Sequence, residues 1–262
     1  MTLSRIYIFY GLTLLSTLFS CPSIAADLTR AQIESLLATA SKDQPADLRR
    51  KDLKGVDLSN LDFRLADLWG ADLRYANFKH SKLSGLVLDL TVMTKINLAG
   101  ADLSNSSIFG VHMVGSDLSG ANLSGSRFIA NLDKSNLSLA NLSHANWGVD
   151  MKNQPMGLMR VSLNSVNLSK ANLSGANLSR ALMRLANLSG ANLTNANLTG
   201  VDLVKADLSQ ADLSGADLSN ALLEDANFAG ANLNGTRFTG IKDKATLRGL
   251  DSSKNLDKAI FN

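Results

Sequence analysis

A five-residue period constrains this chain more strongly than any other feature of its sequence. The period is clearest in residues 171–175 (ANLSG) and 176–180 (ANLSR). Neither a helix, with about 3.6 residues per turn, nor a strand, with a period of about 2, keeps residues five apart on one face. Leu or Phe recurs at every fifth position, with a small residue two positions earlier. For both to point inward, the chain must turn a corner in each unit.

Repeated corners predict a solenoid. Four right-angle corners close a square, so one coil uses about 20 residues, and stacked coils pair like parallel strands about 4.8 Å apart. Leu then stacks on Leu inside the coil, and Ala fits where the corner is tight. Asp, Asn, Ser, Thr and Gly occupy the outside and the turns, as their turn chemistry favours. We therefore expect an all-β solenoid.

The motif resembles the pentapeptide-repeat family over residues 46–249. This resemblance implies a right-handed quadrilateral β-helix. The units number about 39, which corresponds to nine or ten coils and a rod of about 45 Å at strand spacing. Stability in such a rod comes mainly from contacts between neighbouring coils.

The core positions follow the period, with two interruptions. One residue is missing before Ala130, so the phase shifts there, and Trp147 is oversized for its position and predicts a neighbouring gap or bulge. The repeat is interrupted near 150–160, either by a protruding loop or by a bulged coil edge. The expected core up to Trp147 is Leu48, Leu53, Leu58, Phe63, Leu68, Leu73, Phe78, Leu83, Leu88, Met93, Leu98, Leu103, Ile108, Met113, Leu118, Leu123, Phe128, Leu132, Leu137, Leu142 and Trp147.

The two ends of the solenoid differ from the repeat. Residues 27–45 predict a helical N-terminal cap, with a helix in 27–43 and capping-box spacing between Thr29 and Gln32. A partner-binding helix is the alternative. The repeat fails from Ile241, except for a last unit at 245–249. Residues 250–262 then form a C-terminal cap or a contact between two copies.

Residues 1–26 are typical of a signal peptide. Arg5 precedes an apolar stretch that is short for a membrane span, and small residues offer cleavage after Ala25 or Ala26. The alternatives are a retained N-terminal anchor and a lipoprotein with its lipid on Cys21, the only cysteine. We expect export to the periplasm or thylakoid lumen, and no transmembrane span in the mature form.

One outward column carries apolar residues. Read at a spacing of 20, it runs Arg49, Trp69, Asp89, Phe109 and Ile129, with Leu90 beside it. Trp69, Phe109, Ile129 and Leu90 are therefore candidate partner-binding residues, because an exposed apolar patch often marks an interaction site. Coverage by neighbouring side chains or by the N-terminal cap is the alternative. The same spacing places Ser169, Ser189, Ser209 and Ala229 in the equivalent column of the second half.

A second column is amphipathic. It runs through Asn164, Arg184, Val204 and Glu224, beside Leu182, Leu185, Lys205, Leu222 and Asp225. The pattern favours a solvated side with long, partly apolar side chains over a binding surface.

The sequence shows no catalytic constellation, and we expect neither an enzyme nor a cofactor. His80, His112 and His144 fall on three different sides, and a chain cleaved after Ala25 has no cysteine, so a zinc site is not expected. The Asp residues follow the repeat as turn residues. The prediction is a non-enzymatic exported scaffold that binds protein partners through a rigid β-helix.

The family resemblance implies one alternative function. Some pentapeptide-repeat proteins mimic DNA and act on gyrase, usually as dimers joined at their C-termini. That function needs a cytosolic protein with a strongly negative side. Here the net charge is +3, both signs are interspersed, and an export signal precedes the repeat. No nucleic-acid partner is expected, although a homodimer through the C-terminal tail is compatible with the sequence.

Overall fold

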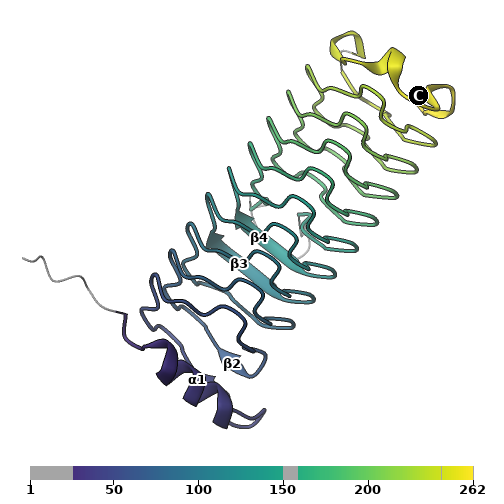
Figure 1. Cartoon of the computed structure of the whole chain (residues 1–262). Coiled ribbons are helices and arrows are strands. Elements are labelled where there is room, and N and C mark those ends of the chain that lie inside the picture. Colours follow the sequence, from purple (N-terminus) through teal and green to yellow (C-terminus); the bar gives the residue numbers. More distant parts are fainter. Residues whose placement is uncertain (1–25, 150–158, 243, 262) are drawn as a thin grey trace, which may run out of the picture.

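The computed structural model describes residues 26–149, 159–242 and 244–261. It is an elongated stack of coils, with a helix at one end and short turns at the other (Figure 1). In those residues, no helix has the length and the apolar character that crossing a membrane requires. The predicted signal peptide and most of the 150–160 interruption lie outside the described residues.

Each five-residue unit makes one side of the coil and one corner. In the unit 171–175, Ala171 and Leu173 are buried, whereas Asn172, Ser174 and Gly175 are only partly buried. We call the place of Asn172 the Asx position, that of Ser174 the outward position and that of Gly175 the corner position. Gly175 has φ +63°, in the left-handed region. Gly and Asn tolerate this region, which explains their frequency at corners.

Successive coils pair in parallel with the predicted step. The amide of Asn77 donates to Asp57, 20 residues earlier, at 2.9 Å. This step confirms the coil of about 20 residues expected from the period. We name the sides by their Asx positions: side C runs from Asp57 to Arg248, and side D from Asp62 to Lys254. Side A contains Asp47, Asp67, Val87, Ser107, Arg127, Asn146, Asn177, Asn197, Asp217 and Arg237, and side B contains Asp52, Asp72, Val92, His112, Asn131, Ser162, Leu182, Asp202 and Leu222.

Two pairs of coils form strands rather than isolated bridges. β1 (Ala46–Asp47) pairs with β2 (Ala66–Asp67), and β3 (Ser107–His112) pairs with β4 (Arg127–Asn131), each in parallel. The register between β3 and β4 shifts between Phe109 and Val111. This shift is the missing residue before Ala130: β4 crosses the corner from side A to side B in extended conformation, with one residue fewer.

The 150–160 interruption adds residues without adding a coil. The amide of Asn172 donates to Asn141 across a step of 31 residues, compared with 20 in regular coils. This step is therefore eleven residues longer than a regular one. The coils on both sides of the interruption still pair directly, through Asn146 and Asn177 for example.

The interior is a continuous column of apolar side chains. The expected core residues from Leu48 to Trp147 are all buried, which confirms the predicted core. Trp147 is 1% exposed and stacks on Phe128, with ring centroids 4.8 Å apart and an interplanar angle of 6°. Its indole N–H donates to Ser126 Oγ at 3.1 Å.

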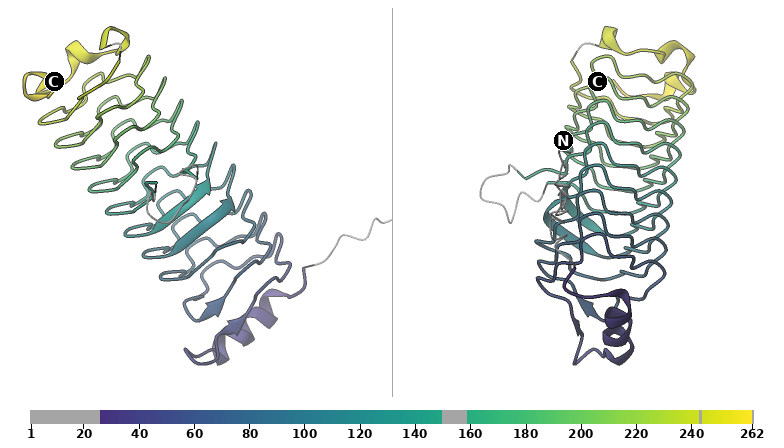
Figure 2. Two further views of the ribbon diagram at one scale, coloured as in Figure 1. Left: turned by 180° about the vertical axis from the view of Figure 1, so that it is seen from behind. Right: turned by 60° about the vertical axis from the view of Figure 1, so that its left-hand side comes forward.

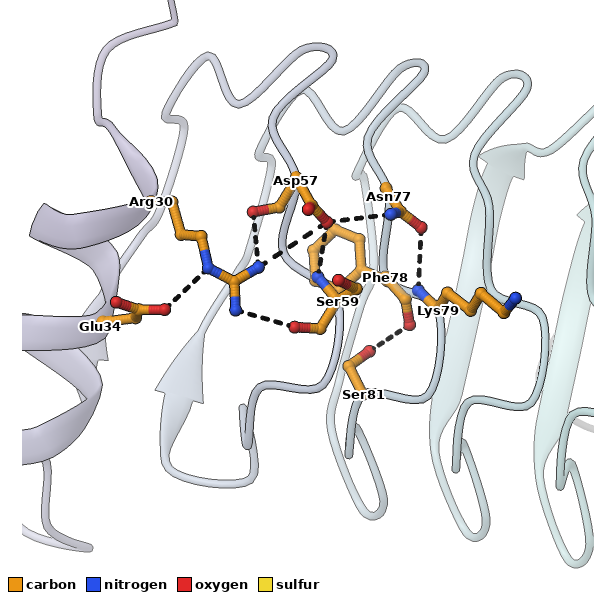
Figure 3. A network of polar contacts seen from close by, with 8 residues as sticks. All are labelled: Arg30, Glu34, Asp57, Ser59, Asn77, Phe78, Lys79 and Ser81. Carbon is orange, nitrogen blue, oxygen red and sulfur yellow. Dashed lines mark hydrogen bonds and ion pairs between the residues drawn. The ribbon is translucent and has the colours of Figure 1, made fainter.

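The N-terminal helix lies across the first coil. α1 (Arg30–Thr39) begins after the capping box of Thr29 and Gln32, as expected, and it buries Ile33 in the core. Arg30 donates to the carbonyls of Asp57 and Ser59, at 3.2 and 3.1 Å (Figure 3). In the next coil, the hydroxyl of Ser81 donates to the carbonyl of Phe78. The helix is thus attached both by an apolar contact and by backbone carbonyls of the coil.

Three 3-10 turns cover the other end: η1 (Lys244–Thr246), η2 (Leu250–Ser252) and η3 (Leu256–Lys258) (Figure 2). Phe261 stacks on the core residue Phe238, with centroids 4.9 Å apart. The predicted last unit at 245–249 is wrong in phase. Arg248 pairs with Asn227 and so takes the Asx position, because η1 occupies the residues before it.

Candidate partner-binding surface

A side chain at the Asx position normally completes the hydrogen bonding of its own turn. Asn177 Oδ1, for example, accepts from the N–H of Ser179 at 3.1 Å. Its amide also donates to Asn146 in the coil below, at 2.9 Å. One Asn therefore closes its turn and links two coils, as Asn77 does on side C (Figure 3). A side built from such units satisfies its own polar groups.

Where the Asx position holds another residue, the coil below can replace the missing acceptor. Ser107 takes the Asx position before Phe109, and the N–H of Phe109 donates to Asp89 of the previous coil at 2.9 Å. Asp133 accepts from the N–H of Asn164 at 2.8 Å in the same way. An acidic residue at an outward position therefore supplies the acceptor that the next coil lacks, because that coil has neither Asn nor Asp at its Asx position. This rule was missed in the sequence analysis. Its signal in the sequence is an Asp at an outward position followed, one coil later, by a Ser at the Asx position.

We call the coils before the 150–160 interruption the lower coils and those after it the upper coils. The lower coils nearest α1 carry carboxylates paired with arginine. Arg49 donates to Asp47 at 2.9 Å and holds the pKa of that carboxyl at about 2. Arg64 lowers the pKa of Asp62 by the same kind of side-chain hydrogen bond. These pairs are exposed, so each contributes little to stability. They neutralise the Asp-rich stretch, which leaves no strongly negative side there.

Side A of the lower coils exposes an apolar patch, which we define as Trp69, Val87, Leu90 and Phe109. Val87 and Leu90 are 57% and 55% exposed, and Trp69 and Phe109 are half-buried. Arg50 lies over the Trp69 ring, 4.9 Å from its centroid. Asp47, Arg49, Arg50 and Trp69 line a hollow of ≈ 380 Å³ beside the patch. Three of the four sequence-derived candidates therefore lie on three successive coils of one side.

The backbone pairing is weakened beneath this patch. No bridge joins Asp67 to Val87 in the described part of side A. The N–H of Gly70 still reaches the carbonyl of Asp89, but at 3.4 Å. At the equivalent corner in the upper coils of side A, the N–H of Arg180 donates to the carbonyl of Thr199 at 2.9 Å. The patch thus combines exposed apolar side chains with peptide groups that are poorly paired within the stack.

Ile129 does not belong to the patch, and its assignment to an exposed surface is wrong. It is 3% exposed, between the buried residues Phe128 and Ala130 of β4. The reason is the missing residue: β4 has no turn at this corner, so Ile129 lies in the extended strand and its side chain is enclosed.

The outward column assigned to the second half also needs correction. Ser169 follows Leu168 on side C, which is opposite side A in the square. One missing and eleven extra residues together displace the spacing by ten, or two sides. The outward positions that continue side A are Ser179, Thr199, Ser219 and Thr239. They are polar, so the contrast between the halves remains.

The second candidate column lies on side B of the upper coils. Its outward positions are Arg184, Val204 and Glu224, and Val204 is only 5% exposed. Leu185 and Leu222 are 59% and 48% exposed beside it. His80, His112 and His144 occupy a side C corner, a side B Asx position and a side D corner. Among the described residues, no group of three or more His, Cys, Asp or Glu side chains is placed to hold a metal ion.

The repeat itself identifies the family. The model of the family "Pentapeptide repeats" matches residues 52–88, 88–125, 162–200 and 202–240, with 8 copies. The chain belongs to the pentapeptide-repeat family. A search of curated protein sequences returns no match.

Solved structures of the same family are similar to this chain. HetL from the cyanobacterium Nostoc sp. strain PCC 7120, involved in heterocyst differentiation regulation, is 28% identical, with coverage of 89% of this chain and 97% of HetL and a TM-score of 0.34. Rfr23 from the cyanobacterium Cyanothece 51142 is 28% identical, covering 50% of this chain and 91% of Rfr23, with a TM-score of 0.33. A thylakoid-lumen pentapeptide-repeat protein of Arabidopsis thaliana is 27% identical, covering 50% and 72%, with a TM-score of 0.22.

Proposed function

We propose that this protein is a non-enzymatic, exported scaffold that binds a protein partner through the apolar patch on side A. The observation that carries the proposal is the exposure of Val87 and Leu90, next to the half-buried rings of Trp69 and Phe109. Elsewhere the repeat fills its outward positions mainly with Ser or Thr. A cluster of exposed apolar side chains on one side of the rod is typical of an interaction site.

The rigid stack supports this role. Trp69 and Phe109 occupy the same outward position two coils apart, which corresponds to about 10 Å. Two aromatic anchors at a fixed spacing lose little conformational freedom on binding, so more of the contact energy appears as affinity. The family's right-handed coil, and the function of α1 and the C-terminal turns as end caps, belong to the same proposal.

The binding test compares two sets of substitutions at equivalent places. Leu90→Asn, combined with Trp69→Ser and Phe109→Ser, removes the apolar patch. Leu139→Asn and Tyr75→Asn form the control, because these side chains are 65% and 55% exposed away from the patch. Leu90, Leu139 and Tyr75 have φ near 60°, where Asn is better tolerated than the native residue. The replacements at these corners therefore preserve the fold.

Affinity capture from the compartment in which the protein accumulates is the measurement. A partner recovered with the native protein and with the control, but lost with the patch variant, supports the proposal. Equal recovery with the patch variant contradicts it. A circular dichroism melt of each variant verifies that it is folded.

Export needs a separate test, because the signal lies outside the described residues. We expect the mature protein to begin at Ala26 or Asp27, as read by N-terminal sequencing. A mature chain that starts at Cys21 and carries lipid would indicate the lipoprotein instead, and Cys21→Ser would then prevent processing. A chain that retains Met1 would contradict export by cleavage.

A further inference from the structure

Side B of the upper coils carries charged and apolar residues in an order that is its own complement. We define the side-B surface as the three stacked units 181–185, 201–205 and 221–225. Its outward column reads Arg184, Val204 and Glu224, which is positive, apolar and negative. Its Asx column reads Leu182, Asp202 and Leu222, with leucine on both sides of a central acid. Both columns are symmetric about the coil 201–205, apart from the sign of the charge.

In the outward column, the apolar Val204 lies between the charged side chains of Arg184 and Glu224. Val204 is 5% exposed, and it forms the floor of a hollow of ≈ 200 Å³ that Arg184, Leu222, Glu224 and Lys242 also line. Leu222 is 48% exposed above it.

The charged residues retain the capacity to bind a second group. Arg184 donates to Asp202 at 3.1 Å, and Asp202 is 12% exposed in its side chain. The Arg184 side chain is itself 52% exposed. A guanidinium has five N–H donors, so it can hold a second carboxylate while it keeps the first.

The leucines replace residues that would serve the fold better. Leu182 and Leu222 occupy Asx positions, where Asn or Asp would accept from the backbone N–H of the outward residue. For Arg184 this acceptor is supplied instead by Asn164 of the previous coil, at 3.0 Å. Giving up the local acceptor for an apolar group on a solvated side has no benefit within one chain. On a surface that a partner covers, the leucines supply apolar contact.

We propose that the side-B surface joins two copies of this chain side by side, with their long axes antiparallel. A two-fold axis across the face, at the level of the coil 201–205, reverses the order of the coils. It places Arg184 opposite Glu224 of the second copy and Leu182 opposite Leu222. Val204 and Asp202 each lie opposite themselves, and the charge of Asp202 is offset by its pairing with Arg184 of its own chain, which leaves its side chain only 12% exposed. Each contact then occurs twice, as an isologous interface requires.

Charge selects this arrangement over the parallel one. In a parallel pair whose two-fold axis runs along the outward column, coils of the same level meet, so Arg184 would face Arg184 and Glu224 would face Glu224. Like charges in contact are strongly disfavoured, whereas the antiparallel pair brings opposite charges together on both sides of the apolar centre. The side-B surface does not include the apolar patch on side A, so this contact does not itself cover the patch.

The surface is three coils high, about 15 Å at strand spacing. It is therefore smaller than the roughly 800 Å² per partner of a stable interface, and we expect a weak, concentration-dependent dimer. The C-terminal tail is a different route to a dimer. Leu250, Leu256 and Phe261 of the tail pack against the core of their own chain.

Sedimentation velocity of the protein purified from the cells that produce it tests the proposal. Concentrations from about 10 μM to about 1 mM cover dissociation constants that correspond to weak binding free energies. We expect the mean mass to rise from one copy to two. Glu224→Arg places like charges opposite each other and should weaken the association at least about tenfold. The triple variant Arg184→Glu, Asp202→Asn and Glu224→Arg exchanges the charges without setting a new carboxylate against Asp202, the partner of Arg184 in its own chain, and should restore the association to within about threefold.

A second pair of variants separates association from folding. Leu182→Asn with Leu222→Asn restores the repeat, so the fold is retained while the apolar contact is lost, and we expect a monomer. Leu139→Asn, on another side, should leave the dimer unchanged. A monomer at every concentration would overturn the proposal, as would a dimer that survives the leucine replacements or that disappears equally in the Leu139 control.

Discussion

The lower and upper coils of side A share one backbone path but use it differently. In the upper coils, Asn177 closes its own turn and links to Asn146 below. In the lower coils, Val87 takes the same position, is 57% exposed, and forms no bridge with Asp67. A side that satisfies its own hydrogen bonds presents a uniform polar surface. A side that gives up some of them gains apolar surface, which a partner can use.

The same trade occurs on side B, where Leu182 and Leu222 take Asx positions. In the repeat, the Asx residue contributes to stability through its turn and its ladder, so its loss has a cost. Substitutions of this kind are informative because the regular units provide the reference. They direct attention to two surfaces on a rod whose other units are largely uniform.

The coil that contains Trp147, where the lower coils meet the upper ones, should show the largest effect on the free energy of unfolding. Trp147→Ala removes a buried ring that stacks on Phe128, and large aromatic truncations in cores cost about 3–5 kcal/mol. We expect a loss of this size in urea unfolding followed by circular dichroism. Leu198→Ala in the regular upper coils is the control and should cost about 2–5 kcal/mol. A loss below about 1 kcal/mol for Trp147→Ala would mean that this coil collapses around the cavity.

Val87→Asn should make the lower coils resemble the upper ones. The new amide can accept from the N–H of Asp89 and donate to Asp67, so we expect a gain of about 0.5–1.5 kcal/mol. Hydrogen exchange at the N–H of Leu68 should slow by about tenfold, because the weakened pairing between the coils of Asp67 and Val87 becomes stronger.

Val92→Asn is the matched control for this change. Val92 also takes an Asx position, but its N–H already donates to Ala71 at 3.0 Å. Exchange near Val92 should therefore change little. An equal slowing in both variants would contradict the special weakness of the Asp67–Val87 step.

Acid should affect the lower coils before the upper ones, although by a small amount. Hydrogen bonds from Arg49 hold the pKa of Asp47 at about 2, below the ordinary 3.8, and Arg64 and Arg74 lower the pKa values of Asp62 and Asp72. Between these values the unfolded chain binds more protons, so stability falls as the pH falls. The contribution is fully present above about pH 4 and lost as the pH passes through the lowered values.

Hydrogen exchange at pH 5 and pH 2.5 measures this difference. We expect faster exchange at the lower pH, after correction for intrinsic rates, in the coils that contain Asp47, Asp62 and Asp72. Replacement of Asp47 by Asn should reduce the response of the first coil. Uniform acceleration along the whole rod would contradict a local origin.

Much of the fold followed from the period because one rule acts locally in every unit. The buried residues from Leu48 to Phe128 and the step of 20 residues could be read from spacing alone. The candidate surface was harder to predict from the sequence. Spacing placed Trp69, Leu90 and Phe109 on one side, but it did not show which side chains are buried. Ile129 was therefore assigned to a surface that it does not reach. A spacing rule also fails across a register change, which explains the displacement of Ser169 from side A to side C.

The sequence by itself determined the coil, its core and its corners, since each depends on residues within five positions and on the nearest neighbouring coil. Only the tertiary structure decided how the coils on both sides of the interruption align. This alignment continues side A from Asn146 to Asn177 and places Ser169 on side C, whereas the residue missing before Ala130 encloses Ile129 within β4. The physical reason is that stacking couples residues 19 to 31 positions apart through hydrogen bonds between coils, which a five-residue rule does not contain.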